Sequence, residues 1–338
     1  MSDVGAPLAA MQATLARLKK DPRVRYAEVR FVEDRTEKLR LRDGRIERAT
    51  TGNARGIAIR VLGPKTWGFS CTSELAEAAI QRAADRAIET ACASSAIVAN
   101  AVVLPERDPE RGAYATNVEI DPTTISLETK LGELDRAVAA LKKGGPKIRS
   151  AEAWMDWSRV RKHLLTTDAC DVAQDFTYGG SGMHVYAVGD DGRAQRRSYP
   201  TWGGGDGYQG GYEKIAALDL VGHALGVVDE ALALLDAPEC PSGTRDLILE
   251  SSQMGLQIHE SCGHPTELDR ALGTEISLAG GSFMQPNLLG KLRYGSPHVD
   301  LVADATSLGG MGTFGWDDEA TPAGKHALVR EGSFVDYL

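Results

Sequence analysis

Apolar residues near the start of the chain recur every three to four positions, at Leu8, Met11, Leu15 and Leu18. This spacing places them on one face of a helix, so we predict an amphipathic helix there. Farther on, apolar residues alternate with charged ones, at Ala27, Val29 and Phe31 and then at Leu39 and Leu41. Asp43-Gly44 follows, with Ile46 after it. An Asp-Gly pair between such runs predicts a β-hairpin.

A second pair of strands and another helix are predicted next. Apolar positions in two short runs indicate the strands, at Ile57, Ile59 and Val61 and then at Trp67 and Phe69. Gly63-Pro64 predicts the turn between them. Thr72-Ser73 is expected to cap an alanine-rich helix that runs to about Cys92. Together these elements favour an antiparallel sheet flanked by helices.

The middle of the chain begins with a weakly patterned connection over residues 93–122. Ser126 is expected to cap an amphipathic helix that Gly144-Gly145-Pro146 ends. Strand-like stretches then reach Tyr199, and their predicted turns lie at Tyr178 to Gly182 and at Asp190-Asp191-Gly192. No internal repeat with a fixed period is present.

A glycine-rich run, residues 202–212, predicts an exposed or functional loop. It contains a formal GxGxxG match at 205–210, but no strand pattern directly precedes it, so we favour a loop over a dinucleotide site. A long helix is predicted over 213–235, and Pro238 and Pro241 mark the next boundary.

The last third starts with Leu247, Ile248 and Leu249, which predict a short buried strand. Ser251 and Ser252 are expected to cap the following helix. Beyond Ala271, glycines and short apolar runs predict β structure, which ends in a hairpin turning at Glu331-Gly332. We therefore predict an α+β fold, an N-terminal domain of antiparallel sheet flanked by helices followed by a β-rich C-terminal domain. Its segments are 1–110, 111–236 and 237–338, the last expected to be incomplete.

The composition narrows the class of protein. The chain has 338 residues, 42% of them hydrophobic and 25% charged, which is typical of globular proteins. A net charge of −9 without a basic stripe argues against nucleic-acid binding. No apolar run approaches the roughly 18 residues that span a bilayer, and five unpaired cysteines indicate no disulfide framework. We expect a cytoplasmic protein.

One short motif carries recognisable chemistry, His259-Glu260-Ser261-Cys262-Gly263-His264. In HExxH sites the histidines are four apart and share a helix face, but here they are five apart, about 140° round an ideal helix. Gly263 and a π-type widening of the turn would bring the rings together. Pro265 disfavours helical geometry at His264, so the regular ladder is expected to break there.

The motif predicts a zinc site with His259 and His264 as ligands. Glu260 is the candidate general base, activating a metal-bound water for attack on a peptide carbonyl. Glu267 and Asp269 lie one turn on, where they are expected to orient an imidazole. The alternative is that unrelated polar residues meet at a helix end.

The block from His259 to Asp269 resembles the HExxGHxxExD pattern of the TldD/PmbA metallopeptidases, specifically the TldD-type subunit. Other stretches are similar to the family as well: Arg60-Val61-Leu62 with Trp67-Gly68-Phe69, Cys240-Pro241-Ser242-Gly243, and the run from Gly312 to Glu319. The resemblance extends from about residue 25 to the end. It implies that the C-terminal domain is a metallopeptidase domain.

The resemblance also implies Zn²⁺ held by the two motif histidines and a cysteine near the C-terminus. It implies hydrolysis of short or unfolded peptides, and a homodimer or a heterodimer with a PmbA-type subunit. Two features depart from the family: Pro265 replaces a small residue, and the sequence stops before the cysteine position, which neither Cys240 nor Cys262 occupies. The alternative is therefore a non-catalytic scaffold or partner subunit.

The remaining candidates have structural interpretations. His223 is expected to be a partly buried structural histidine, and none of the isolated histidines is favoured as a third ligand, namely His163, His184, His298 and His326. Asp317-Asp318-Glu319 is expected to be a solvated turn rather than a calcium site. Trp154, Met155 and Trp157 are expected in the core.

Overall fold

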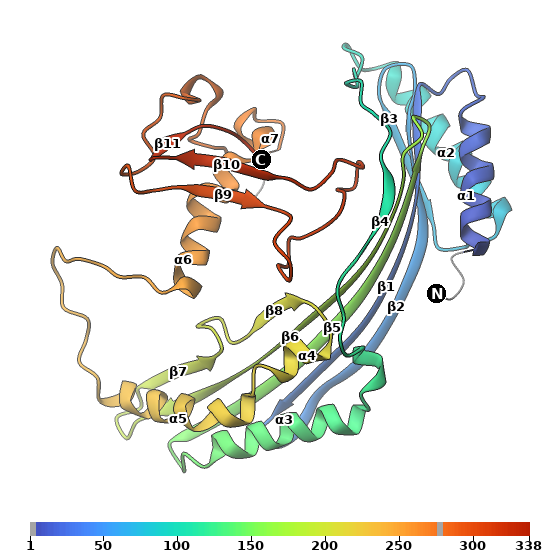
Figure 1. Ribbon diagram of the computed structural model, residues 1–338. Helices are drawn as coiled ribbons and strands as arrows, with labels where there is room; N and C mark the ends of the chain where they lie inside the picture. Colours follow the sequence, from blue (N-terminus) through green and yellow to red (C-terminus); the bar gives the residue numbers. More distant parts are fainter. Residues whose placement is uncertain (1–4, 276–279) are drawn as a thin grey trace.

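The computed structural model describes residues 5–275 and 280–338. A long curved sheet occupies most of the N-terminal part, helices cover its convex side, and the C-terminal part sits over its concave side (Figure 1). The α-helices are α1 (Gly5–Leu18), α2 (Glu77–Ser95), α3 (Leu127–Lys142), α4 (Tyr212–Ala216), α5 (Leu220–Asp236), α6 (Ser251–Ile258) and α7 (Leu268–Ala271). Within the described residues, no helix is both long and apolar enough to cross a membrane.

The large sheet has the strand order β3-β2-β1-β5-β6-β4, and β7 and β8 also pair with β6. Its strands are β1 (Tyr26–Arg42), β2 (Arg45–Leu62), β3 (Trp67–Thr72), β4 (Arg111–Ala115), β5 (Ile148–Thr166), β6 (Asp171–Val188), β7 (Ala194–Tyr199) and β8 (Asp206–Gln209). The pairs are antiparallel except for β4 with β6. The predicted α+β class and flanked antiparallel sheet are confirmed.

The first hairpin is confirmed. Asp43 and Gly44 join β1 to β2 with φ values of 52° and 77°. Positive φ at both central residues is the signature of the type I′ turn, whose twist matches that of the strands. The register then runs the length of both strands, from Arg42↔Arg45 to Tyr26↔Leu62.

Alternation along the strands places apolar side chains on the convex face, where they form two hydrophobic clusters. Near one end, α1 and α2 pack on β1 and β2 around residues such as Val29, Ile59 and Ile88. Near the other end, α3 and α5 pack on a second cluster that includes Leu39, Leu134 and Val228. The concave face stays free of helices and faces the C-terminal part (Figure 1).

The turn predicted at Tyr178 to Gly182 is wrong, because these residues lie within β6 and pair with β5 and β8. The glycines are there for close packing. A Cβ on Gly182 would lie 2.1 Å from the carbonyl oxygen of Gly204, and one on Gly180 would lie 2.8 Å from that of Asp206. Glycine therefore lets the 203–207 backbone cross the sheet, a role that the sequence does not distinguish from a turn.

Three helix starts differ from expectation and one is confirmed. At the first of the three, α6 begins without a side-chain cap, so Ser251 and Ser252 do not cap it as predicted. The side chain of Ser126 accepts a hydrogen bond from the Thr129 N–H at the start of α3, as predicted. By contrast, α2 begins at Glu77 without a side-chain cap, so Thr72-Ser73 does not cap it. The helix predicted over 213–235 is two helices, because Asp219 turns left-handed (φ 43°) and caps α5. An Asp in the αL region can end one helix and start another.

Strand predictions were also incomplete. β4 lies within the supposed connection 93–122, and β8 within the glycine-rich run 202–212. In contrast, 247–249 form no strand in the described structure: Leu247 is 78% exposed and Ile248 is 95% exposed. A short apolar run indicates a strand only where a neighbour offers hydrogen bonds, which a local pattern does not reveal.

The C-terminal part is less regular than predicted. Short strands β9 (Leu301–Asp304), β10 (Lys325–Arg330) and β11 (Ser333–Phe334) form a sheet, and the rest beyond Ala271 is mainly turns. The predicted hairpin is confirmed, since Glu331 and Gly332 join β10 to β11. A small core that includes Cys262, Met284 and Phe334 holds this part together.

The turn at Asp317-Asp318-Glu319 joins the two parts of the molecule. The side chains of Asp318 and Glu319 are about half exposed, but they form ion pairs with the concave face of the sheet, whereas Asp317 accepts from backbone N–H groups within the turn. Asp318 lies 3.0 Å from both Arg30 and Lys162, and Glu319 lies 2.7 Å from Arg60. The acidic turn thus forms ion pairs with three cationic side chains, each from a different strand.

Candidate metal centre

The motif begins where α6 changes its winding. After Ile258 the chain forms a π-helical turn over His259–Gly263 and then a 3₁₀ turn over His264–Thr266. The His264 N–H donates to the carbonyl oxygen of His259, five residues back. One extra residue in the turn brings positions five apart to the same side of the helix. The predicted π-type widening is therefore confirmed.

The predictions for Pro265 are confirmed in part. The regular helical ladder is broken at His264, as predicted, because the π turn ends there and a 3₁₀ turn begins. His264 itself keeps right-handed helical angles (φ −59°, ψ −43°), so the predicted departure of its backbone from helical geometry is wrong. Pro265 sits in the first turn of the 3₁₀ helix, where its missing N–H leaves no bond unmade. The helical path instead ends at Glu267, whose ψ is 112°.

This winding brings the three predicted site residues together. The two imidazole rings have centroids 4.5 Å apart and are inclined by 80°. Ligand atoms of His259, Glu260 and His264 all lie within 4.8 Å of one another. His259 and Glu260 are exposed and His264 is partly buried, so solvent reaches the group.

A carboxylate holds one imidazole in place. Nδ1 of His264 lies 2.8 Å from Oε1 of Glu267, so the ring donates its Nδ1–H and leaves Nε2 as the available ligand atom. Asp269 instead accepts from the backbone N–H of Arg270. Glu267 thus occupies the orienting position that the sequence suggested, and Asp269 does not.

Arg270, which was not among the residues predicted for the site, donates from Nε to Oε2 of Glu267 at 2.6 Å. The i, i+3 spacing of an acid and a base was the available signal. Burial acts to raise the pKa of Glu267, but hydrogen bonds from His264 and Arg270 outweigh it and hold that pKa below its usual value. The hydrogen bond with Glu267 in turn raises the pKa of Arg270.

The cysteine inside the motif points elsewhere. Cys262 is fully buried in the small C-terminal core with Met284 and Phe334, and burial raises the pKa of its thiol. Cys240 is exposed in the chain between α5 and α6. Among the described residues, neither belongs to the group of ligand atoms that converges on the histidines.

A groove with a volume of about 680 Å³ lies on the concave face of the sheet. Trp154, Asp156 and Tyr178 line it from the sheet, residues of the 203–207 loop form a wall, and Met311 reaches it from the C-terminal part. The same loop region touches α6, because Trp202 Nε1 donates to the Ser252 carbonyl oxygen at 3.4 Å. The glycine-rich run therefore borders a groove at the foot of the motif helix.

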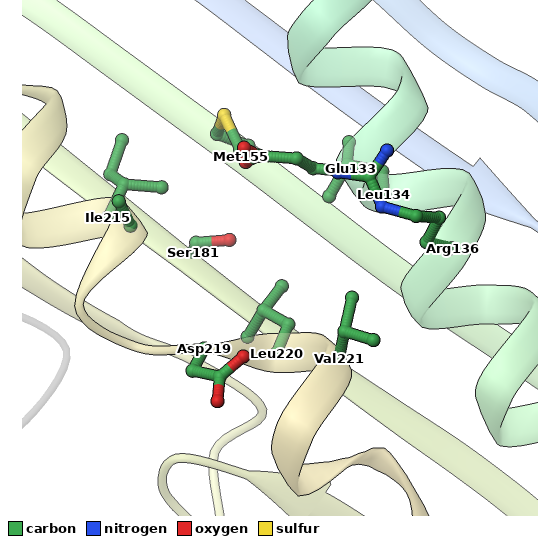
Figure 2. Close-up of a pocket in the computed structure, with 10 residues that line it drawn as sticks. Glu133, Leu134, Arg136, Met155, Ser181, Ile215, Asp219, Leu220 and Val221 are labelled. Carbon is green, nitrogen blue, oxygen red and sulfur yellow. The ribbon is translucent and has the colours of Figure 1, made fainter.

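A second, smaller cavity of about 270 Å³ lies on the convex face, where α3 and the α4–α5 turn meet over the sheet (Figure 2). Glu133 and Arg136 line it from α3, and Met155 and Ser181 from the sheet. The motif histidines do not line it.

The other sequence candidates occupy structural positions. Met155 is buried as predicted, whereas Trp154 and Trp157 are only partly buried and line the concave groove. His223 is exposed rather than partly buried, and its ring stacks on Tyr199 with centroids 4.2 Å apart.

Two family models match the chain: PmbA/TldA metallopeptidase domain 1 over residues 27–91, and the PmbA/TldA metallopeptidase C-terminal domain over residues 242–338. The second match includes the whole histidine motif. The chain belongs to the PmbA/TldD metallopeptidase family. Names within the family point to a metalloprotease-type function and thus to a metal cofactor.

A metalloprotease of Methanocaldococcus jannaschii is 26% identical over 313 residues, 93% of this chain. The chain spans 65% of that relative's length. Crystal structures of two other proteins share the fold. One is from Bacteroides thetaiotaomicron (TM-score 0.78, 12% identity, 98% of this chain and 71% of that one), and the other is TldE from Thermococcus kodakarensis (TM-score 0.68, 14% identity, 97% and 69%).

Proposed function

We propose that this chain carries the zinc site of a metallopeptidase that hydrolyses short or unfolded peptides. The observation that supports the proposal most is the convergence of His259, Glu260 and His264 within 4.8 Å on a π-helical turn. A π turn is rare and is frequently found at functional sites. Here it brings to one side of the helix two histidines that an α-helix would hold about 140° apart.

The residues present fit a zinc ion. Two neutral imidazoles are preferred zinc ligands, and the hydrogen bond from His264 to Glu267 leaves the ring nitrogen on the other side free to bind. Zinc, when bound, would supply Lewis acidity toward a peptide carbonyl and lower the pKa of water. In this proposal, Glu260 accepts the proton of the attacking water, and its exposed position gives water access.

The concave groove extends the proposal to the substrate. It combines aromatic surfaces of Trp154 and Tyr178 with polar side chains, and Trp202, next to the 203–207 wall, touches the first turn of α6. The motif begins seven residues after Ser252, about 10 Å along the helix at 1.5 Å per residue. An extended peptide of about four residues covers that distance, so we propose that the groove receives residues flanking the cleaved bond.

We also propose a third protein ligand for the site and an assembly for the chain. By resemblance, a cysteine that lies outside the described group completes the coordination, and the chain pairs with a second copy or with a PmbA-type subunit in the cytoplasm. The competing proposal is a non-catalytic scaffold or partner subunit, because among the described residues only His259, Glu260 and His264 converge at the site.

The deciding experiment is zinc analysis of the purified chain beside His259→Ala, with His298→Ala as control because that exposed histidine lies in the same part of the molecule. We expect about one zinc per chain, lost in His259→Ala and kept in the control. Equal, negligible zinc in all three would refute the site and favour the scaffold. Glu260→Gln should keep the metal and abolish cleavage of a peptide library measured by mass spectrometry.

A further inference from the structure

Arg270 is a nearly buried cation directly after the metal motif. It lies in α7, and its side chain is only 7% exposed. The guanidinium turns back toward Glu267: Nε and Nη2 both lie 2.6 Å from Oε2. Nη1 donates to the Gly280 carbonyl oxygen at 3.1 Å. A buried guanidinium with this many contacts has one orientation, because moving it would leave a charge unpaired in the interior.

The contacts form a relay of three side chains. Arg270 holds Oε2 of Glu267, and His264 holds Oε1 of the same carboxylate at 2.8 Å. His264 and Arg270 meet on one carboxylate, although the chain leaves helical geometry at Glu267 between them (ψ 112°). Because the two oxygens serve different partners, Glu267 cannot rotate away from the imidazole without breaking its ion pair with Arg270.

We infer that Arg270 is a positioning residue of the proposed metal site, acting through Glu267 on the orientation of the His264 ring. The inference rests on the proposed function, since it concerns a ligand of that site. With the carboxylate fixed, the ring keeps its proton on Nδ1 and presents Nε2 on the side of His259 and Glu260. Partners of ligands that fix ring orientation in this way affect metal affinity without touching the metal.

Arginine suits this role better than lysine. Its planar guanidinium grips Oε2 with two nitrogens and reaches the Gly280 carbonyl with a third. A lysine ammonium is a point charge on a flexible stem and does not reproduce that fork. Lysine at position 270 should therefore restore the charge but only part of the orientation.

The test is a zinc-affinity series by competition with a chromogenic chelator, comparing the unaltered chain with Arg270→Met, Arg270→Lys, Glu267→Gln and the double variant Glu267→Gln/Arg270→Met. Arg330→Met is the matched control, because Arg330 is exposed at the end of β10. We expect Arg270→Met to weaken zinc binding about tenfold, within the range for partners of metal ligands. Arg270→Lys should recover part of this loss, and the control should bind like the unaltered chain.

The double variant separates positioning from general structural support. If Arg270 acts through Glu267, adding Arg270→Met to Glu267→Gln should cost less than about twofold more, because the relay is already broken. Equal affinity of Arg270→Met and the unaltered chain would overturn the inference, and so would an additive loss in the double variant.

Two further readouts keep the outcomes separate. Circular dichroism reports whether each variant folds. If Arg270→Met does not fold, Arg270→Lys decides instead: it should fold and bind zinc two- to fivefold more weakly than the unaltered chain, a loss of about 0.4 to 1 kcal/mol in binding free energy. Unchanged zinc affinity in Arg270→Lys would then refute the positioning role. Failure of the proposed function looks different, since zinc would then bind neither the unaltered chain nor His259→Ala. Cobalt substitution should show a shifted visible spectrum in Arg270→Met, as expected for a reoriented imidazole.

Discussion

The long sheet and the motif helix α6 are built in opposite ways. Along β1 and β2, residues such as Val29 and Ile59 are fully buried beneath α1 and α2. No residue of α6 is buried, and Met254, Leu256 and Ile258 are each more than a third exposed. The sheet therefore derives its stability from apolar burial, whereas α6 contributes little to the hydrophobic core.

The motif region is instead anchored just beyond α6, by a few specific contacts. Cys262 is buried in the C-terminal core, and its carbonyl oxygen accepts from the Thr266 hydroxyl at 2.7 Å. The Leu338 N–H donates to the Thr266 carbonyl oxygen at 2.8 Å, and the Ser282 hydroxyl to that of Pro265 at 2.5 Å. Folding and metal chemistry thus rest on different residues, so substitutions should affect them separately.

The largest contrast is expected between two isoleucines. Ile59→Ala should lower the free energy of unfolding by about 2–5 kcal/mol, because it opens a cavity in the sheet core. Ile258→Ala, 39% exposed in α6, should cost less than about 0.5 kcal/mol. Urea unfolding followed by circular dichroism measures both. Comparable losses would show that α6 belongs to the same packed core.

A glycine in each region gives the next contrast. Gly182→Ala should destabilise the fold by about 1–3 kcal/mol, because its Cβ would meet the Gly204 carbonyl at 2.1 Å. Gly255→Ala in α6 meets nothing within 4 Å and should stabilise that helix by about 0.5–1 kcal/mol. Thermal unfolding tests the first, and a two- to fivefold slower hydrogen exchange of α6 amides tests the second. Faster exchange in Gly255→Ala would contradict the open surroundings.

Removing a serine at the start of a helix should also affect the two regions differently, with a smaller difference in the free energy of unfolding. Ser126→Ala removes the hydrogen bond to the Thr129 N–H at the start of α3 and should cost about 1 kcal/mol. Ser251→Ala should be nearly neutral, because the first turn of α6 has no side-chain cap. Both variants are compared by urea midpoint with unchanged slope. A loss in Ser251→Ala equal to that in Ser126→Ala would reverse this prediction.

The smallest effects should appear as opposite pH dependences. Burial raises the pKa of Asp156 in the groove, so its charged form costs stability above that pKa. Asp156→Asn should therefore raise the Tm at pH 7, with the gain shrinking as the pH falls toward about 4, the unfolded value. In the C-terminal part, hydrogen bonds from Thr306 lower the pKa of Asp304. Asp304→Asn should lower the Tm at pH 7, and this loss should disappear as the pH falls through the lowered pKa. Equal pH profiles for both variants would contradict these assignments.

The sequence alone determined those features whose cause is local. Asp43-Gly44 predicts its hairpin because the pair tolerates positive φ at both turn positions, and Ser126 predicts a helix start because its hydroxyl caps a nearby N–H. The spacing of His259 and His264 similarly required a π-type turn, because five residues do not fit one turn of an α-helix.

Tertiary structure alone decided the features whose cause lies far along the chain. Gly180 and Gly182 accommodate a backbone that crosses the sheet, and Leu247 and Ile248 stay exposed because no described strand pairs with them. The acidic turn at Asp318 meets cations from Arg30 and Lys162, more than 150 residues away in sequence. Such contacts depend on which surfaces the folded chain brings together. A local pattern of residues does not show which distant residues will become neighbours.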